Sequence, residues 1–150
     1  MSDVTKEELC ARVTREVAEM ASRLEGVDEE LFLKPVGTGE WTLRDLLSHL
    51  LFWQKECLWA LKSTLEGTYE RRDYSDVDKT NAAGVESLKD LKPLEVIAQL
   101  KASGVDIAET IKIIPEDLWE TKPRLAAWVH GSVTHHYEEH TPDIISVIGT

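Results

Sequence analysis

Four stretches of the chain repeat apolar residues at steps of three and four positions, which is the spacing of one face of an α-helix. They cover about 5–24, 42–66, 93–114 and 125–148. No stretch alternates apolar and polar residues over the length of a β-strand, so no sheet is predicted. The pattern predicts an all-α fold with four long helices.

Residues with known capping preferences stand at the ends of the first two predicted helices. Thr5 precedes Glu8 in a capping-box pattern. Thr42 can cap the second helix, with Asp45 at its third position, and Gly67 follows its last apolar residue. These residues define where both helices begin and where the second one ends.

A long polar segment joins the second and third helices. Residues 67–92 are too many for a tight turn between antiparallel neighbours, and they can hold a short helix at about 81–88. Pro93 then opens the third helix where proline is tolerated, and Pro115 closes it. Four helices with one long crossover form a known connectivity, so we predict a four-helix bundle.

Length and composition favour a single domain over residues 1–150. Of the 150 residues, 42% are hydrophobic, which is enough for one continuous core. Cys10 and Cys57 lie far apart and outside any CxxC pattern, so we expect reduced thiols. The chain does not open with a basic segment followed by an apolar one, and no stretch is long enough to span a bilayer. We therefore expect a cytoplasmic protein.

The net charge argues against nucleic acid as a partner. The chain has 28 Asp and Glu against 17 Lys and Arg, which gives a formal charge of −11. The acidic residues are spread along the whole chain, so we expect them to repel a phosphate backbone and an anionic membrane. A small molecule remains as the expected partner.

Three histidines form a candidate metal site. His136 and His140 are spaced i, i+4, which places both imidazoles on one face of the fourth helix. His49 lies mid-way along the second helix near its core-facing side, so the three can meet across the bundle. Three imidazoles with one open position are the ligand set of a catalytic metal site. The pair can equally be a polar helix face, and His49 can be a buried histidine that is hydrogen-bonded to a backbone carbonyl or to Asp45.

Several residues around these histidines have two interpretations each. His135 adjoins His136, and the i, i+4 spacing favours His136 as the inward residue. Glu56, two turns further along the second helix, is a candidate general base, although 28 carboxylates also bring one close by chance. Trp128 can line a pocket mouth or pack in the core. Pro142 is expected to kink or end the fourth helix near the site.

Two motifs resemble those of a known family. They are GEWTLRDLLSHLLFW at 39–53 and THHYEEHTPDI at 134–144, and the segments between them are similar as well. Over nearly its whole length the chain resembles the DinB-like four-helix bundles, and among them the ClbS/DfsB-like subgroup. The resemblance implies an up-down-down-up bundle, often a homodimer, that holds a divalent transition metal, with nickel and zinc favoured. The ligands it implies are His49, His136 and His140.

The same resemblance implies a range of activities. Relatives catalyse thiol-dependent S-transfer and isomerisation, metal-dependent hydrolysis, and the protective opening of an electrophilic natural product. We therefore expect a metal-dependent hydrolase or thiol S-transferase that acts on a small electrophile. Because metal retention varies within the subgroup, the alternative is a metal-free protein that sequesters a small molecule in a pocket lined by His and Trp. A third hypothesis is an interaction module that uses only its helix faces.

Overall fold

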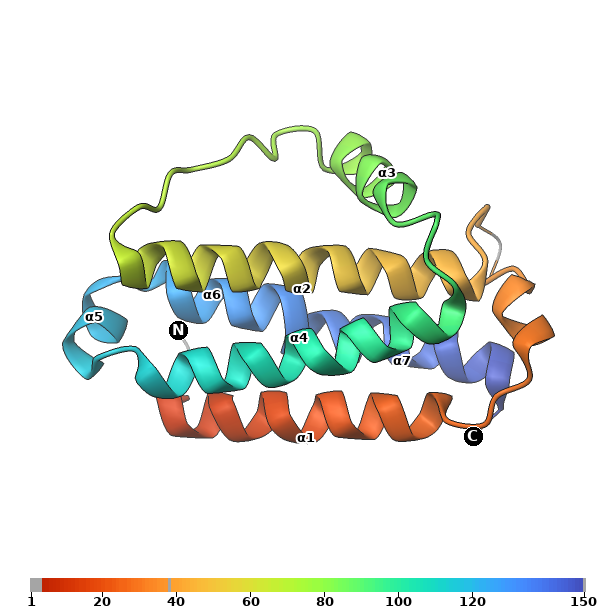
Figure 1. Ribbon diagram of the computed structural model, residues 1–150, viewed down its shortest axis with the longest axis horizontal. Helices are drawn as coiled ribbons and strands as arrows, with labels where there is room; N and C mark the ends of the chain where they lie inside the picture. Colours follow the sequence, from red (N-terminus) through yellow and green to blue (C-terminus); the bar gives the residue numbers. More distant parts are fainter. Residues whose placement is uncertain (1–3, 38, 150) are drawn as a thin grey trace.

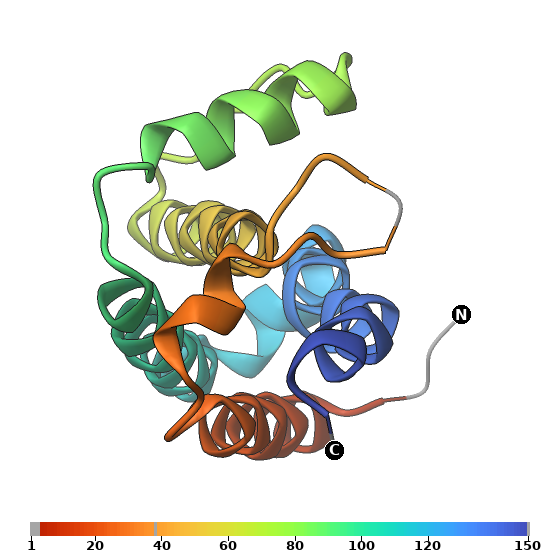
Figure 2. The ribbon, with the colours of Figure 1, turned by 90° about the vertical axis from the view of Figure 1, so that its right-hand side faces the viewer.

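The computed structural model describes residues 4–37 and 39–149, and over these ranges the protein is all-α. Four long helical rods surround one apolar core (Figures 1 and 2). α1 spans Lys6–Leu24, α2 spans Leu43–Glu66 and α4 spans Pro93–Ile113, while α6, a π-helical turn and α7 form the fourth rod. The predicted all-α four-helix bundle is confirmed.

The rods run up, down, down and up. Figure 1 shows α1 and α7 running in one direction and α2 and α4 in the other. The crossover, residues 67–92, carries the chain back along the length of α2, so that α2 and α4 lie parallel and pack against each other. Since α2 has 24 residues and is roughly 36 Å long, only a long connection can make this return.

Capping residues begin and end the helices where the sequence predicts. Thr5 Oγ1 accepts a hydrogen bond from the N–H of Glu8 at 3.0 Å. Thr42 and Asp45 form a reciprocal capping box with bonds of 3.2 and 3.0 Å. Gly67 ends α2 with φ +78°, a left-handed conformation that glycine adopts without steric cost. The capping box of Thr42 and Asp45 fixes the start of α2, close to His49.

α3, Val77–Ser87, packs outside the bundle on α2 (Figure 2). It begins before the predicted helix at 81–88 because the Asp76 side chain caps it, accepting a backbone N–H at 3.1 Å. Gly84 lies against the ring of Phe52 on α2, where an added Cβ would come within 2.5 Å. This close approach holds α3 against α2.

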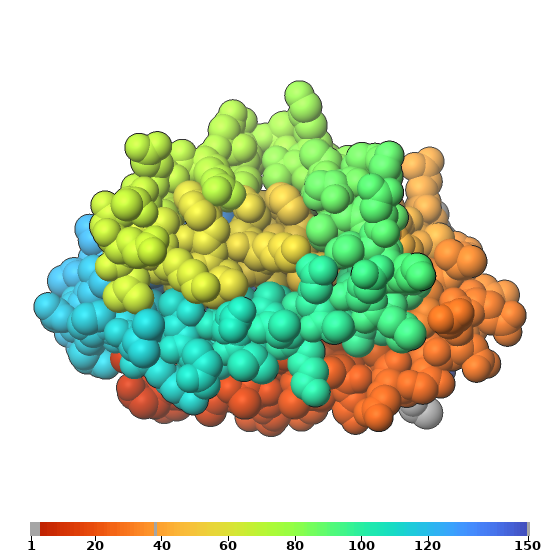
Figure 3. All heavy atoms as spheres, viewed as in Figure 1, coloured from red at the N-terminus to blue at the C-terminus, as the bar shows by residue number. Residues whose placement is uncertain are grey.

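Two shorter elements complete the chain. A 3-10 helix, Glu29–Leu33, follows α1, and α5, Glu116–Thr121, follows α4. The space-filling view of Figure 3 shows the crossover and α3 standing over α2, with α4 and α1 below them. None of the helices in the described part of the chain is both long enough and apolar enough to cross a bilayer.

The fourth rod is divided where the sequence pattern predicts one helix at 125–148. α6 spans Arg124–Val129, a π-helical turn spans His130–Thr134, and α7 spans His135–Ile148. The N–H of the first residue of α7 donates to the carbonyl of the first residue of the π turn, an i→i+5 hydrogen bond. The π turn inserts one extra residue and changes which side chains face the core.

Pro142 does not end the helix, although ending it is one of the two effects that the sequence analysis expects of this residue. α7 continues past it to Ile148. Proline removes the hydrogen bond to the carbonyl four residues earlier, and that residue, Glu138, is exposed, so water can take the place of the missing donor. The helix therefore continues beyond the three histidines to Ile148.

Candidate metal centre

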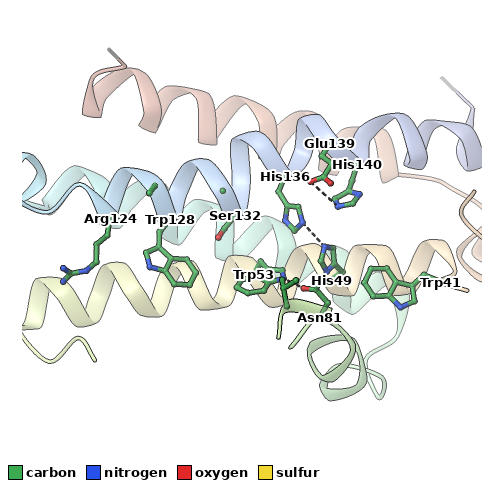
Figure 4. Close-up of a pocket in the computed structure, with 13 residues that line it drawn as sticks. Trp41, His49, Trp53, Asn81, Arg124, Trp128, Ser132, His136, Glu139 and His140 are labelled. Atoms are coloured by element: carbon green, nitrogen blue, oxygen red, sulfur yellow. Dashed lines mark hydrogen bonds and ion pairs between the residues drawn. The ribbon is translucent and has the colours of Figure 1, made fainter. Parts of the chain in front are cut away.

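Three imidazoles converge between α2 and α7 (Figure 4). His49 comes from the second turn of α2, and His136 and His140 come from successive turns of α7. One ligand nitrogen from each of the three lies within 4.8 Å of the others. The Nε2 atoms of His49 and His136 are only 2.8 Å apart. The bundle thus brings together the three histidines that the sequence analysis singles out.

The histidine doublet has one inward and one outward member. His136 is buried, with 8% of its surface exposed. His135 is exposed, and its ring lies 5.6 Å from that of His130. This is the register that the i, i+4 spacing favours.

Trp41 forms one wall of the histidine cluster. It immediately precedes the capping box of α2, and its ring centroid lies 4.9 Å from that of His49. His49 is 5% exposed, because the bundle core and this indole surround it. The cap that starts α2 therefore also positions an aromatic cover over the first of the three imidazoles.

Burial keeps two of these imidazoles neutral. Desolvation, aided by the neighbouring histidines, lowers the pKa of His49 to about 3. The same desolvation, with His140 nearby, lowers the pKa of His136 to about 4. Near neutral pH both rings are uncharged, and a neutral imidazole has the free lone pair that a metal ligand needs.

The cluster is not explained by core packing alone. The Nδ1 atoms of His49, His136 and His140 are buried and have no hydrogen-bond partner within the described ranges. A buried polar atom without a partner costs about 1–3 kcal/mol. Three such imidazoles side by side fit a divalent transition metal, because they supply three nitrogen donors and leave room for a fourth ligand.

Acidic side chains flank the third imidazole. Asp143, one turn further along α7, places Oδ2 3.6 Å from Nδ1 of His140, and Glu139 places Oε1 3.9 Å from Nε2. A carboxylate beside the non-coordinating nitrogen is the usual way in which a metal-bound histidine is oriented. Asp143 stands where such an orienting group would be.

Glu56 faces the crossover. Its carboxylate accepts hydrogen bonds from Arg72 at 2.8 Å and from the Tyr74 hydroxyl at 2.6 Å. These contacts tie the crossover to α2. Burial, and after it the hydrogen bond to this carboxylate, raises the pKa of Tyr74. Glu56 is not among the described residues that line the histidine pocket, so its predicted role as a general base has no support in the geometry and stays a prediction.

A pocket of about 650 Å³ opens beside the three imidazoles. Besides the histidines it is lined by aromatic side chains, by polar groups and by parts of α3 and α6: Trp41, Trp53, Val77, Asn81, Arg124, Ala127, Trp128, Gly131, Ser132 and Glu139. The indole N–H of Trp53 donates to the Asn81 side chain at 2.7 Å, which joins α2 to α3 at the pocket rim. The volume is within the range of sites for small organic molecules.

In the α6 part of this pocket, the sequence analysis identified Trp128 as a candidate lining residue but did not identify Arg124. The sequence does contain a signal for it, because polar and aromatic residues recur at four-residue steps up to and including the histidine pair. They are Arg124, Trp128, Ser132, His136 and His140. In a straight α-helix a four-residue step drifts around the axis, so this series does not predict one face until the π turn is known.

Comparisons with a family model and with solved structures agree on one fold for this chain. The model of the mycothiol maleylpyruvate isomerase N-terminal domain matches residues 13–144. Two solved structures have the same fold: the colibactin self-resistance protein ClbS in complex with a double-stranded DNA, and DfsB, described as a sibling lethal factor precursor. ClbS has a TM-score of 0.84 and 15% identity over 98% of this chain and 97% of its own. DfsB has 0.81 and 16% over 97% and 95%. A search of curated proteins finds no match.

The expectation that nucleic acid is excluded as a partner is wrong. ClbS, with the same fold, was solved in complex with double-stranded DNA. Net charge is a poor basis for such an exclusion, because binding depends on the local charge of one face. Even in this acidic chain, one groove is lined by two arginines, of which Arg72 is paired with Glu56. Its lining residues are Tyr69, Arg71, Arg72, Asp73, Tyr74, Ser75 and Trp128.

Proposed function

Because the chain belongs to the family of the mycothiol maleylpyruvate isomerase N-terminal domain, with a DinB-like fold, we propose that it is a metal-dependent enzyme that acts on a small electrophilic molecule. The observation that supports this most strongly is the cluster of three imidazoles, all within 4.8 Å of one another. The cluster forms part of the wall of a pocket of about 650 Å³. A metal ligand set that faces a substrate-sized pocket is the arrangement of a catalytic site.

In this proposal His49, His136 and His140 hold a divalent transition metal, nickel or zinc. Such an ion lowers the pKa of a bound water or thiol and polarises an electrophile, which is the chemistry of a hydrolase or a thiol S-transferase. The burial that keeps the first two imidazoles neutral keeps their lone pairs available. Trp53 and Trp128 exclude water from the middle of the pocket and offer apolar surface to the substrate.

The metal content of the protein tests the proposal directly. Protein purified without an affinity tag or chelator is analysed for transition metals, and we expect about one equivalent. His136→Asn removes one ligand and should reduce this at least tenfold. His135→Asn is the matched control: it changes the adjacent, exposed imidazole and should leave the metal content unchanged.

The outcome also separates the two main hypotheses. If the unaltered protein holds less than about a tenth of an equivalent and rebinds none, the metal-dependent enzyme is ruled out. The metal-free binding protein then explains the site, because the hydrogen bond of 2.8 Å between His49 and His136 can join the rings without an ion. Ligand-induced melting shifts that survive chelator treatment would support that alternative.

A further inference from the structure

Arg124 lines the pocket and has no carboxylate partner among the residues that the structure describes (Figure 4). Its Nε atom is buried without a hydrogen-bond partner, and Nη2 donates to Thr64 Oγ1 at 3.2 Å. Arg72, by contrast, is paired with Glu56 at 2.8 Å. Acidic residues outnumber basic ones in this chain by 28 to 17, so most arginines have a carboxylate within reach. An arginine that lines a pocket without an acidic partner is available to a ligand.

The Arg124 guanidinium is held in place before any ligand arrives. It lies 4.1 Å from the ring centroid of Tyr69, and its hydrogen bond to Thr64 fixes a second direction. Tyr69 is in turn packed on Trp59, with ring centroids 5.3 Å apart. A side chain that is already ordered loses little conformational entropy on binding, so this guanidinium is suited to recognise an anion.

One stripe of side chains connects this guanidinium to the histidines. Its members recur at four-residue steps along the fourth rod: Arg124, Trp128, Ser132, His136 and His140. In an unbroken α-helix each four-residue step drifts by roughly 40°, so four steps would turn the first residue away from the last. All five nevertheless line one pocket.

The π turn at His130–Thr134 accounts for this alignment. Its i→i+5 hydrogen bond accommodates about one extra residue, which takes back roughly 100° of the accumulated drift. α6 is thereby rotated so that Arg124 and Trp128 face the same cavity as the histidines of α7. The break in the fourth rod therefore has a consequence for binding, because it adds a cationic end and an aromatic middle to the pocket.

The spacing of these groups limits the shape of the ligand. Arg124 and His136 are 12 residues apart, or roughly 18 Å along the rod, and Figure 4 shows the guanidinium at the end of the pocket away from the histidines. Trp53 and Trp128, with ring centroids 6.3 Å apart, line the space between them. This space suits a long, flat and largely apolar molecule.

We propose that the pocket binds an elongated, flat molecule with a carboxylate at one end, which pairs with Arg124, while its other end lies at the histidines. A single carboxylate matches one guanidinium, whereas a doubly charged phosphate would meet more repulsion in a chain of net charge −11. The proposal names the substrate class of the proposed enzyme and rests on that function for what happens at the histidine end.

A matched pair of probes tests the anion site. Biphenyl-4-carboxylate and its neutral isostere biphenyl-4-carboxamide are titrated by isothermal calorimetry into metal-loaded and chelator-treated protein. We expect the carboxylate to bind about tenfold or more tightly than the amide in both forms, as a charge-assisted hydrogen bond provides. Arg124→Met should abolish this preference, whereas Arg71→Met, at an exposed arginine outside the pocket lining, should retain it.

Each outcome of this experiment bears on the proposal. Equal binding of the two probes by the unaltered protein, no binding of either, or a preference that survives Arg124→Met in folded protein overturns it. Should Arg124→Met fail to fold, Arg124→Lys keeps the charge without the planar fork and should show a reduced preference. A preference that persists in protein unable to hold metal supports the carboxylate site while the metal-dependent enzyme fails.

Discussion

The polar residues buried in this bundle are of two kinds, those with a protein partner and those without one. Gln54 belongs to the first kind: its amide donates to the carbonyl of Leu100 at 3.0 Å and to Ser103 Oγ at 2.8 Å, and its Oε1 accepts from the Tyr137 hydroxyl. His49 belongs to the second, since its Nδ1 meets no partner in the described part of the chain. The first kind fixes how α2, α4 and α7 pack, and the second marks the pocket.

Tyr137→Phe tests the structural network. The change leaves Gln54 Oε1 buried without its donor, so we expect the free energy of unfolding to fall by about 1–3 kcal/mol in urea denaturation. Tyr69→Phe is the control, because no hydrogen bond of its hydroxyl is found among the described residues and its ring contacts are kept. Equal stability of the two variants would show that the hydrogen bond from the Tyr137 hydroxyl to Gln54 does not stabilise the fold.

Single residues differ in how far the sequence reveals them. His136 and His140 are recognisable because i, i+4 spacing places them together on a helix of any length. Arg124 is not, because its position on the pocket face depends on the π turn at His130–Thr134, which lies between it and the histidine pair. Glu56 is hard to interpret from the sequence for a different reason. Its hydrogen-bond partners, Arg72 and Tyr74, come from the crossover, and the sequence does not specify the path of that segment.

At the scale of elements, helix starts are predictable where a side chain satisfies free backbone N–H groups. Thr5 and Thr42 do so, and the helices they begin agree with the sequence prediction. The π turn has no comparable capping signal, because it changes only the number of residues per turn. The prediction for the fourth rod therefore gives its extent but not its break at His130–Thr134.

Gly84→Ala tests how α3 is held over the pocket. An added Cβ would lie 2.5 Å from the Phe52 ring, so α3 must shift away from α2. We expect faster amide hydrogen exchange in Val77–Ser87, which contains the pocket residue Asn81, with the metal content unchanged. Gly131→Ala is the control, since no atom lies within 4 Å of its added Cβ. In this variant, amide exchange in Val77–Ser87 should be as slow as in the unaltered protein. Unchanged exchange in Gly84→Ala would mean that α3 is held by other contacts.

For the whole molecule, the length of the crossover is what makes the connectivity predictable. A polar segment over residues 67–92 can return along α2, which makes α2 and α4 parallel neighbours. The sequence resemblance to DinB-like bundles adds the order up, down, down, up, and the family match over residues 13–144 agrees with it. Total charge is less informative at this scale, because Arg71 and Arg72, which are adjacent in the sequence, line one groove although the net charge is −11.

Metal binding should stabilise the bundle as a whole, because the three imidazoles come from α2 and α7, which are far apart in sequence. An ion that binds only the folded state adds about 2.7 kcal/mol of stability when its free concentration is one hundred times Kd. For a chain of this size that raises Tm by roughly 5–10 °C. Differential scanning calorimetry of chelator-treated protein, with and without added nickel or zinc, measures the shift. His49→Asn should abolish it and His135→Asn should preserve it, whereas equal melting of treated and reloaded protein would contradict a metal bridge between the helices.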